Sequence, residues 1–382
     1  MLVSACDEFS RVDFVLRISN LQFLVYMFML KIINHQRVLK QTMRNKSLGW
    51  MIGVLLLTVI GVGLYSFGLR AVYRHWGYFF LKPAETQWPA GSKEGIKNLL
   101  GELKGKIVWG SSRTKTHQLF LMTFPDLRIY QLTDHPHVSY HPRFSPEGQR
   151  IVFARSQRPW VSERDQIPWD VYILNLAGGK ERLAAQNGNF PLWLPDGERI
   201  LFLRKDQVVV KDLNTEKERV LFDGRKPPFD GEPSNPEICP WDPGLLSVTL
   251  RGKTHGVFII NLKTGNQFLL SGPGCEATWR PDHREIVWVQ NGGRGETQVM
   301  VSPVDRVSPS VFMDLPFSFS HEYFPRFSAD GKWFIWGASE GEHEHDIADY
   351  EIFLWKVGTP WGKAVRLTFN SANDRFPDIY LE

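Results

Sequence analysis

The chain has 382 residues, of which 43% are hydrophobic and 23% charged, and this ordinary balance excludes wholesale disorder. Its net charge of +4 is small and lies partly beside one hydrophobic segment, so we expect no nucleic-acid partner. The 14 Trp and 26 Phe favour strands and packed sheet faces, which indicates an all-β protein.

Residues 48–69 form an uncharged, mostly apolar segment of 22 residues. As a helix it would extend roughly 33 Å, enough to cross a bilayer. More cations precede the segment than follow it: Lys31, Arg37, Lys40, Arg44 and Lys46 stand before it, and Arg70, Arg74 and Lys82 after it. This bias predicts that residues 1–47 are cytoplasmic. We therefore expect a single-pass anchor in the cytoplasmic (inner) membrane, with the rest of the chain on the periplasmic or extracellular side.

Two other interpretations of residues 48–69 remain open. A buried core helix is one. A cleaved signal peptide is the other, because Ser66-Phe67-Gly68 resembles a cleavage site, although the apolar run is longer than a usual signal core. Met43 begins a charged stretch that leads into the apolar run, as an anchor normally opens, so residues 1–42 are interpreted as an upstream extension.

Residues 70–104 are interpreted as a juxtamembrane linker, punctuated by prolines. Within it, residues 92–104 predict a short amphipathic helix, because four apolar side chains recur on one side: Ile96, Leu99, Leu100 and Leu103.

Six apolar runs recur along the remainder of the chain. They are Ile107-Val108-Trp109, Ile151-Val152-Phe153, Ile200-Leu201-Phe202, residues 245–250, Ile286-Val287-Trp288 and Phe334-Ile335-Trp336. Five of them follow a tight-turn signal such as Pro195-Asp196-Gly197. Equivalent turn positions, Gly148, Gly197, Gly244, His283 and Gly331, are 49, 47, 39 and 48 residues apart. This period is typical of a β-propeller.

Each unit also has an aromatic residue before its turn and two further strands after its apolar run, as in Gly256 to Leu262 and Glu218 to Phe222. The units therefore read as four-stranded blades, and residues 105–382 predict a six-bladed β-propeller that follows the single transmembrane helix. The last run, Arg375 to Leu381, has the position of an innermost strand, while the runs near residues 106–111, 118–123 and 128–133 have none. Joining them predicts a sixth blade closed by both ends of the domain.

The repeats resemble those of the TolB-like β-propeller family, in which an acid, a Pro, an aromatic and a Pro-Asp-Gly turn precede an apolar strand. The pattern is seen in Pro142-x-Phe144, Pro191-x-Trp193 and Pro325-x-Phe327. The acid three residues before the proline is present as Glu322 and Asp374 but is replaced by Ser139 and Gly188 in the first two units. The resemblance implies the fold; family members include receptors, scaffolds and the propeller halves of hydrolases.

No nucleophile elbow or phosphate-binding loop is present, so no catalytic residue, cofactor or metal ligand is assigned. Residues 340–346 gather carboxylates and imidazoles that could bind a divalent metal, but a solvated loop is the favoured interpretation. In another loop, Trp160 and Trp169 could stack on a sugar or peptide, against the alternative that they pack beneath the loop. Cys239 and Cys275 occupy similar places in adjacent units, so a disulfide is considered.

The leading prediction is a non-enzymatic binding or scaffolding propeller that recognises a protein, peptide or glycan of the cell envelope. In an up-and-down meander, the loops between second and third strands share one face with the crossovers between blades, and the long segments 156–169, 223–240 and 338–349 all fall there. We expect a ligand-binding set near the channel mouth on that face: His137, His141, Glu276, Glu322 and Asp374. The alternative is a propeller hydrolase or lyase acting on a carbohydrate or lactone with a metal at the central channel.

Overall fold

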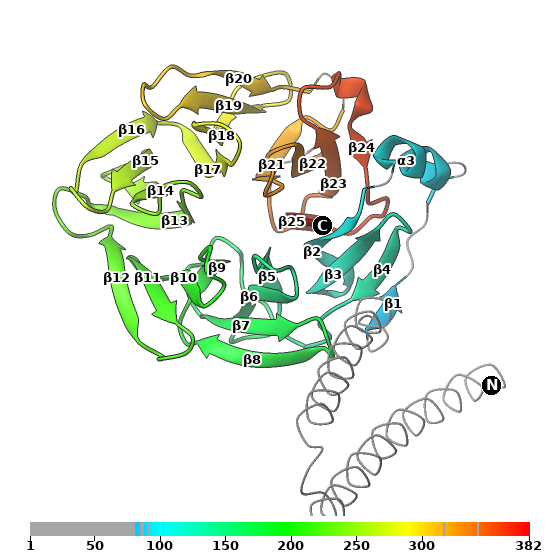
Figure 1. Ribbon diagram of the computed structural model, residues 1–382, viewed down its shortest axis with the longest axis horizontal. Coiled ribbons are helices and arrows are strands. Elements are labelled where there is room, and N and C mark those ends of the chain that lie inside the picture. The colour runs from blue at the N-terminus through cyan, green and yellow to red at the C-terminus, as the bar shows by residue number, and fades with distance from the viewer. Residues whose placement is uncertain (1–80, 85–87, 90–91, 102, 316–317, 342–343) are drawn as a thin grey trace, which may run out of the picture. The chain divides into compact units, whose positions relative to one another are not determined.

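The computed structural model describes residues 81–84, 88–89, 92–101, 103–315, 318–341 and 344–382. Within these ranges the chain forms six antiparallel sheets arranged as blades around a central axis (Figure 1). The predicted six-bladed, all-β propeller is thus confirmed. The predicted cytoplasmic segment 1–47, anchor 48–69 and start at Met43 lie outside the described residues. Over the described ranges, no helix combines the length and apolar character that crossing a membrane requires.

Blades 2 to 6 each contain four strands that pair in chain order, with the first strand nearest the axis (Figure 1). Blade 2 consists of β5 (Ser139–Phe144), β6 (Arg150–Ser156), β7 (Trp169–Asn175) and β8 (Lys180–Ala185). Blade 3 consists of β9 (Asn189–Trp193), β10 (Arg199–Arg204), β11 (Gln207–Asp212) and β12 (Glu218–Asp223). Blade 4 consists of β13 (Gly231–Ile238), β14 (Leu245–Gly252), β15 (Gly256–Asn261) and β16 (Gln267–Ser271).

Blade 5 consists of β17 (Gly274–Arg280), β18 (Glu285–Asn291), β19 (Thr297–Pro303) and β20 (Ser310–Met313). Blade 6 consists of β21 (His321–Phe327), β22 (Trp333–Ser339), β23 (Glu351–Lys356) and β24 (Val365–Arg366), with a 3₁₀ turn, η1 (Trp361–Lys363), before its last strand. The inner strand of blade 4 corrects the sequence analysis. Residues 223–240 were expected to be one long loop, and that prediction was wrong for Gly231–Ile238. Its prolines suggested irregular structure, but Pro236 lies within the bulge between Ser234 and Glu237, where the strand tolerates a missing N–H.

Blade 1 closes the ring with strands from both ends of the domain. β25 (Asp374–Leu381) is its innermost strand and pairs with β2 (Gly105–Thr114), from Gly105 opposite Leu381 to Ser111 opposite Asp374. β3 (Thr116–Phe124) and β4 (Arg128–Gln131) follow outwards. The predicted closure is confirmed. A fifth, outermost strand, β1 (Lys82–Ala84), was not expected, because its three residues carry no strand pattern and are held by backbone pairing to β4.

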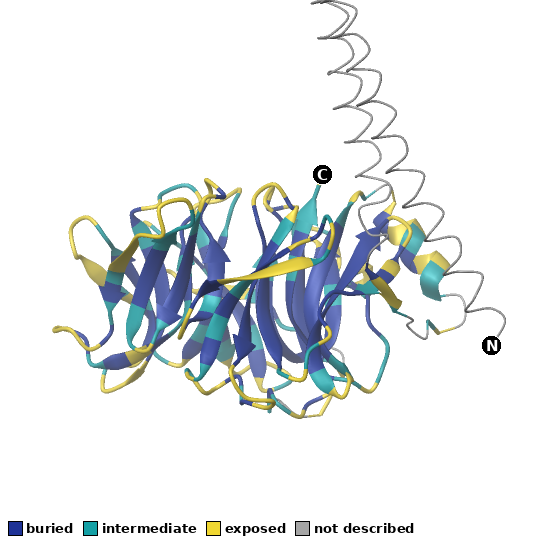
Figure 2. Ribbon diagram, turned by 90° about the horizontal axis from the view of Figure 1, so that it is seen from below, coloured by how far each residue is buried: buried dark blue, intermediate teal, exposed yellow. Residues whose placement is uncertain are grey.

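The second strand of each blade is apolar along its length because neighbouring blades cover both of its faces (Figure 2). Ile107-Val108-Trp109, Ile200-Leu201-Phe202 and Phe334-Ile335-Trp336 are all fully buried. The outermost strands have one face in solvent and expose single apolar side chains, such as Val220 and Val311. The recurring runs in the sequence are therefore the cores between blades.

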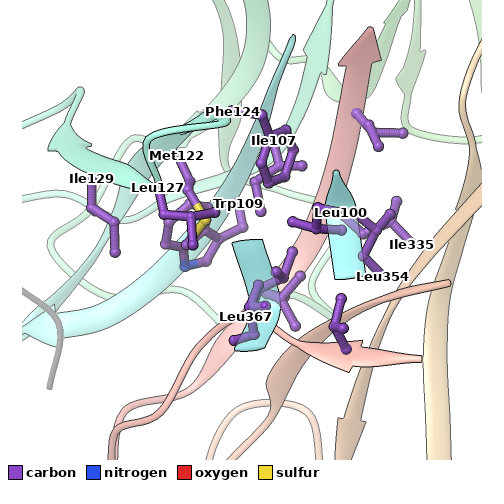
Figure 3. Packing of buried hydrophobic residues seen from close by; sticks show 14 of the residues in the cluster. Leu100, Ile107, Trp109, Met122, Phe124, Leu127, Ile129, Ile335, Leu354 and Leu367 are labelled. Carbon is purple, nitrogen blue, oxygen red and sulfur yellow. The ribbon is translucent and has the colours of Figure 1, made fainter. Parts of the chain in front are cut away.

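The predicted short helix is α3 (Ser92–Leu100), which ends where Gly101 takes a φ of +61°. Its Ile96 and Leu100 are buried in a cluster with Ile107, Trp109 and Leu367, between blades 1 and 6 (Figure 3). The helix therefore covers the seam beside the closing strands.

Candidate functional site

Two loops meet on the face that carries the second-to-third-strand loops and the crossovers, hereafter the long-loop face. One, residues 157–168, connects β6 to β7, and the other, residues 340–350, connects β22 to β23. The Nδ1 of His345 lies 2.6 Å from the Oε1 of Glu163, and both side chains are buried. The Ser162 hydroxyl donates to Asp346. Buried polar contacts thus join loops from two different blades.

Arg375, on the closing strand β25, donates hydrogen bonds to this junction. Its side chain is fully buried, and its Nη2 donates to Asp346 at 3.1 Å and to the Tyr140 hydroxyl at 2.6 Å. Its Nη1 donates to the carbonyl of His345. Burial alone would raise the pKa of Glu163, but the hydrogen bond and charge of His345 and the charge of Arg375 lower it to about 2. Glu163 is therefore a carboxylate at neutral pH.

The loop of residues 157–168 also reaches across the ring. The side-chain amide of Gln166 donates to the carbonyl of Pro233 in blade 4 at 2.8 Å, while Glu163 contacts blade 6. Trp169, considered above as a stacking residue, is fully buried and donates to the carbonyl of Asp165 at 2.6 Å. Trp169 therefore packs beneath the loop and stabilises it. The loop thus spans from blade 2 towards blades 4 and 6, over the axis.

A ring of six side chains narrows the channel beneath this loop. Each inner strand has one non-glycine residue in the left-handed region, with φ between +47° and +59°, and each lies at a break in strand register. These residues are His141, Phe190, Asn235, Glu276, Phe324 and Phe376. The His141 ring centroid lies 4.2 Å from those of Phe190 and Phe376. The adjoining cavity of about 10 Å³ has room for about one water.

A second ring, of charged groups, lies two residues further along the inner strands, towards the short turns. Arg326 and Arg143 approach Glu237 at 2.9 and 3.9 Å, and Asp378 accepts the Phe144 N–H at 2.7 Å. Burial raises the pKa of Glu237 to about 7 and that of Asp378 to about 6, although the nearby Arg143 opposes both shifts. The channel is therefore mainly aromatic in the middle and lined by Arg, Glu and Asp side chains towards the short turns.

The structure brings together two of the five predicted ligand residues. His141 and Glu276 both border the small cavity in the channel. Burial lowers the pKa of His141 to about 3 and raises that of Glu276 to about 7, and Glu276 accepts the Phe324 N–H at 2.6 Å. His137 lies outside this ring, half-buried, with its Nδ1 2.8 Å from the Ser156 carbonyl. Their part in binding a ligand stays a prediction.

Glu322 and Asp374, the other two, are fully buried beside neighbouring blades rather than at the channel. Glu322 accepts from the Leu315 N–H at 2.9 Å and the Thr297 hydroxyl at 3.2 Å. Regular alternation would have placed both acids on the same side of the strand as Phe324 and Phe376. The left-handed residue and bulge change the side on which they lie.

A pocket of about 420 Å³ opens beside the loop junction. It lies between the β2–β3 hairpin, the crossover to blade 2 and the two long loops; its lining includes Lys115, His117, Trp160, Ile347, Ser371 and Asn373. Trp160, one of the two tryptophans considered for stacking, is 62% exposed there. No sequence pattern marks His117 or Asn373, because strands and loops far apart in the chain bring them to this pocket.

Two further expectations have simple outcomes. His345 and Asp346, from the acidic and histidine-containing stretch, lie in the buried junction and not in solvent, while Glu342 and His343 lie outside the described residues. Where residues are described, no group of three or more metal-binding side chains is gathered. Cys239 and Cys275 are both free thiols, so the disulfide is not formed.

Comparisons with solved structures identify similar folds. TolB from Acinetobacter baumannii aligns with a TM-score of 0.55 at 16% identity, over 73% of this chain and 67% of that one. Kuenenia stuttgartiensis hydrazine synthase aligns with a TM-score of 0.52 at 12% identity, over 78% of this chain and 50% of that one. An oligogalacturonate lyase in complex with manganese aligns with a TM-score of 0.45 at 14% identity, over 76% of this chain and 77% of that one, a likeness too low to bear on activity.

No protein-family model matches the chain, and no curated protein matches its sequence. The domain therefore has a TolB-like six-bladed fold, and the likeness extends to the fold alone.

Proposed function

We propose that this protein is a non-enzymatic binding or scaffolding module that recognises a protein partner through its long-loop face. A rigid ring of blades that presents ordered loops suits recognition of a partner, which supports this class of function. The uncharged residues 48–69 and the cations before them support a position at the outer surface of a cytoplasmic membrane.

The observation that carries the proposal is the pair of loops joined above the ring. Long loops are normally costly to order, but here buried contacts between Glu163 and His345 and between Asp346 and Arg375 hold them in place. The two loops nevertheless expose apolar side chains: Ile347 is 73% exposed and Ile167 is 55% exposed. Apolar groups on an ordered surface are typical of sites that a partner covers.

Photo-crosslinking in the native organism tests the proposal. Benzoylphenylalanine placed at Ile167 or Ile347 should give a discrete crosslinked protein adduct. The same group at Lys263, an exposed residue in a short turn on the opposite face, is the matched control and should not. Adducts of equal yield from both faces, or from neither, would contradict the assignment of the long-loop face.

A further inference from the structure

The pocket beside the loop junction has mostly polar walls, although Ile347 of the long-loop face also lines it. Its volume of about 420 Å³ is near the lower end of the range for small-molecule sites, so it admits a single small chemical group and not a folded element. Most of its lining side chains are polar: Ser112, Lys115, Thr116, His117, Asp346, Ser371 and Asn373. The apolar lining groups are fewer and include the exposed indole of Trp160.

Two atoms in the deeper part of the wall lack hydrogen-bond partners, although the Asn373 Nδ2 donates to the His345 carbonyl at 2.6 Å. His117 is 6% exposed and Asn373 is 5% exposed, and both line the pocket. Neither the Nδ1 of His117 nor the Oδ1 of Asn373 has a hydrogen-bond partner among the described residues. Buried polar atoms are usually paired, so these two are open to a ligand that can donate to one and bond to the other. Both lie just beneath the pocket surface, so a small side-chain turn accompanies such binding.

The buried groups of the wall carry no uncompensated charge, which favours a neutral ligand. Asp346 is already compensated by Arg375 at 3.1 Å and by the Ser162 hydroxyl. Burial and the charge of Arg375 hold the pKa of His117 well below its usual range, so its ring is uncharged. Lys115, an exposed residue, is the one cation among the described lining residues.

We propose that this pocket binds a neutral sugar residue, stacked on Trp160 with its hydroxyl groups towards His117 and Asn373. A pyranose ring has an apolar C–H face that packs on an indole, and hydroxyls at its edge that both donate and accept. An apolar side chain of a peptide would leave the polar wall unpaired. This site is additional to the surface proposed for a protein partner.

Saturation-transfer NMR on the full-length protein, kept in a detergent without a sugar headgroup, tests this site. The probes are the methyl glycosides of glucose, galactose, mannose and N-acetylglucosamine, measured singly. At least one should receive saturation, strongest at the C–H protons of one ring face. Trp160→Ala should weaken its binding about tenfold, equivalent to about 1.4 kcal/mol. His117→Phe, which keeps a ring packed on Tyr140 but removes both nitrogens, should also weaken it.

Leu183→Ala is the control, because Leu183 is an exposed apolar residue on the same blade but outside the pocket, and it should leave sugar binding unchanged. Melting temperatures equal to that of the wild type show that each variant is folded. The proposal is overturned if no glycoside receives saturation, or if Trp160→Ala leaves the response unchanged. It is also overturned if neutral hexapeptides, and no glycoside, give a response that depends on Trp160. Crosslinking at Ile167, which lies outside the pocket, would leave the protein-partner proposal standing if it persists in those cases.

Discussion

The indole N–H of Trp109, on β2, donates a hydrogen bond of 3.1 Å to the carboxylate of Asp374, on β25, although 265 residues separate them in the chain. Both side chains are fully buried. The same carboxylate accepts from Arg113 at 2.8 Å and from the Asn370 amide at 2.6 Å. Asp374 therefore pairs with two side chains of β2 and with one side chain of the loop that precedes β25, at the point where the ring closes.

Asp374→Ala should lower the free energy of unfolding by about 3–5 kcal/mol, because it leaves Arg113 and the indole of Trp109 without their buried partner. Asp374→Asn should have a smaller effect, since its amide oxygen can still accept from Trp109. Urea unfolding followed by tryptophan fluorescence measures both. Asp134→Asn, which breaks an exposed pair with Lys82, is the control and should change stability by less than about 0.5 kcal/mol.

Gly148→Ala should destabilise the domain more than Gly265→Ala. Both glycines are in turns with left-handed φ, of +69° and +74°, so alanine should cost about 1–2 kcal/mol at either. At Gly148, however, a Cβ would lie 2.6 Å from ring atoms of Tyr380 on β25, whereas at Gly265 nothing lies within 4 Å. Thermal melting compares them. Equal losses would mean that the Tyr380 ring moves aside without cost.

Glu322→Gln should remove a pH dependence of stability. Burial raises the pKa of Glu322 from 4.5 to about 8. Between these values the unfolded chain has released its proton while the folded chain retains it, so wild-type stability falls as pH rises through this window. The neutral variant lacks this loss, which is at most about 5 kcal/mol for such a shift. The free energies of unfolding of the wild type and of Glu322→Gln, measured from pH 4.5 to pH 8, should converge at pH 4.5. A difference between them that is the same at every pH would contradict the raised pKa.

Glu163→Ala should release the junction of the two long loops without unfolding the ring. It leaves His345 without its buried partner, and losing a charge-assisted hydrogen bond raises local opening about ten- to a hundredfold. Tryptic cleavage after Arg164, which is 54% exposed, reports the opening. Glu344→Ala, which removes only the exposed contact of that arginine at 3.3 Å, is the control and should leave the cleavage rate nearly unchanged.

The lowered pKa of Glu163 also predicts how cleavage of the loop depends on pH. The pKa of Glu163 is lowered from 4.5 to about 2, so its contribution to stability is fully present above pH 4.5 and is lost as pH falls towards 2. Wild-type cleavage at the loop should therefore rise on acidification in that window, measured with pepsin in place of trypsin, while the alanine variant should change less.

The blades were predictable because their signals are local. A turn such as Pro195-Asp196-Gly197 and the apolar run after it lie within a few residues, and the repetition of such pairs indicates the number of blades. The inner strands were harder, because a residue such as Phe324 or Asn235 in the left-handed conformation has no distinctive sequence pattern. Unless the bulge at Phe324 is known, the side of the strand on which Glu322 lies cannot be deduced from the sequence.

The candidate site was predictable only in part for a related reason. The long loops were found from their length, and His141 and Glu276 from their place in the repeat. The junction, however, joins Glu163 to His345, which are 182 residues apart, and no pattern in a single sequence indicates a contact of that range. His117 and Asn373 were missed in the same way.

The position of the closing strand at the end of the domain delays the closure of the ring during biosynthesis. The 259 residues between Thr114 and Asp374 must be made before β2 can meet β25, and at about 5–20 residues per second this takes on the order of tens of seconds. Throughout that interval the inner edge of β2 is an unpaired strand, open to other chains. The nascent domain should therefore depend on a holdase chaperone until its last strand emerges, and slowing translation should increase its aggregation.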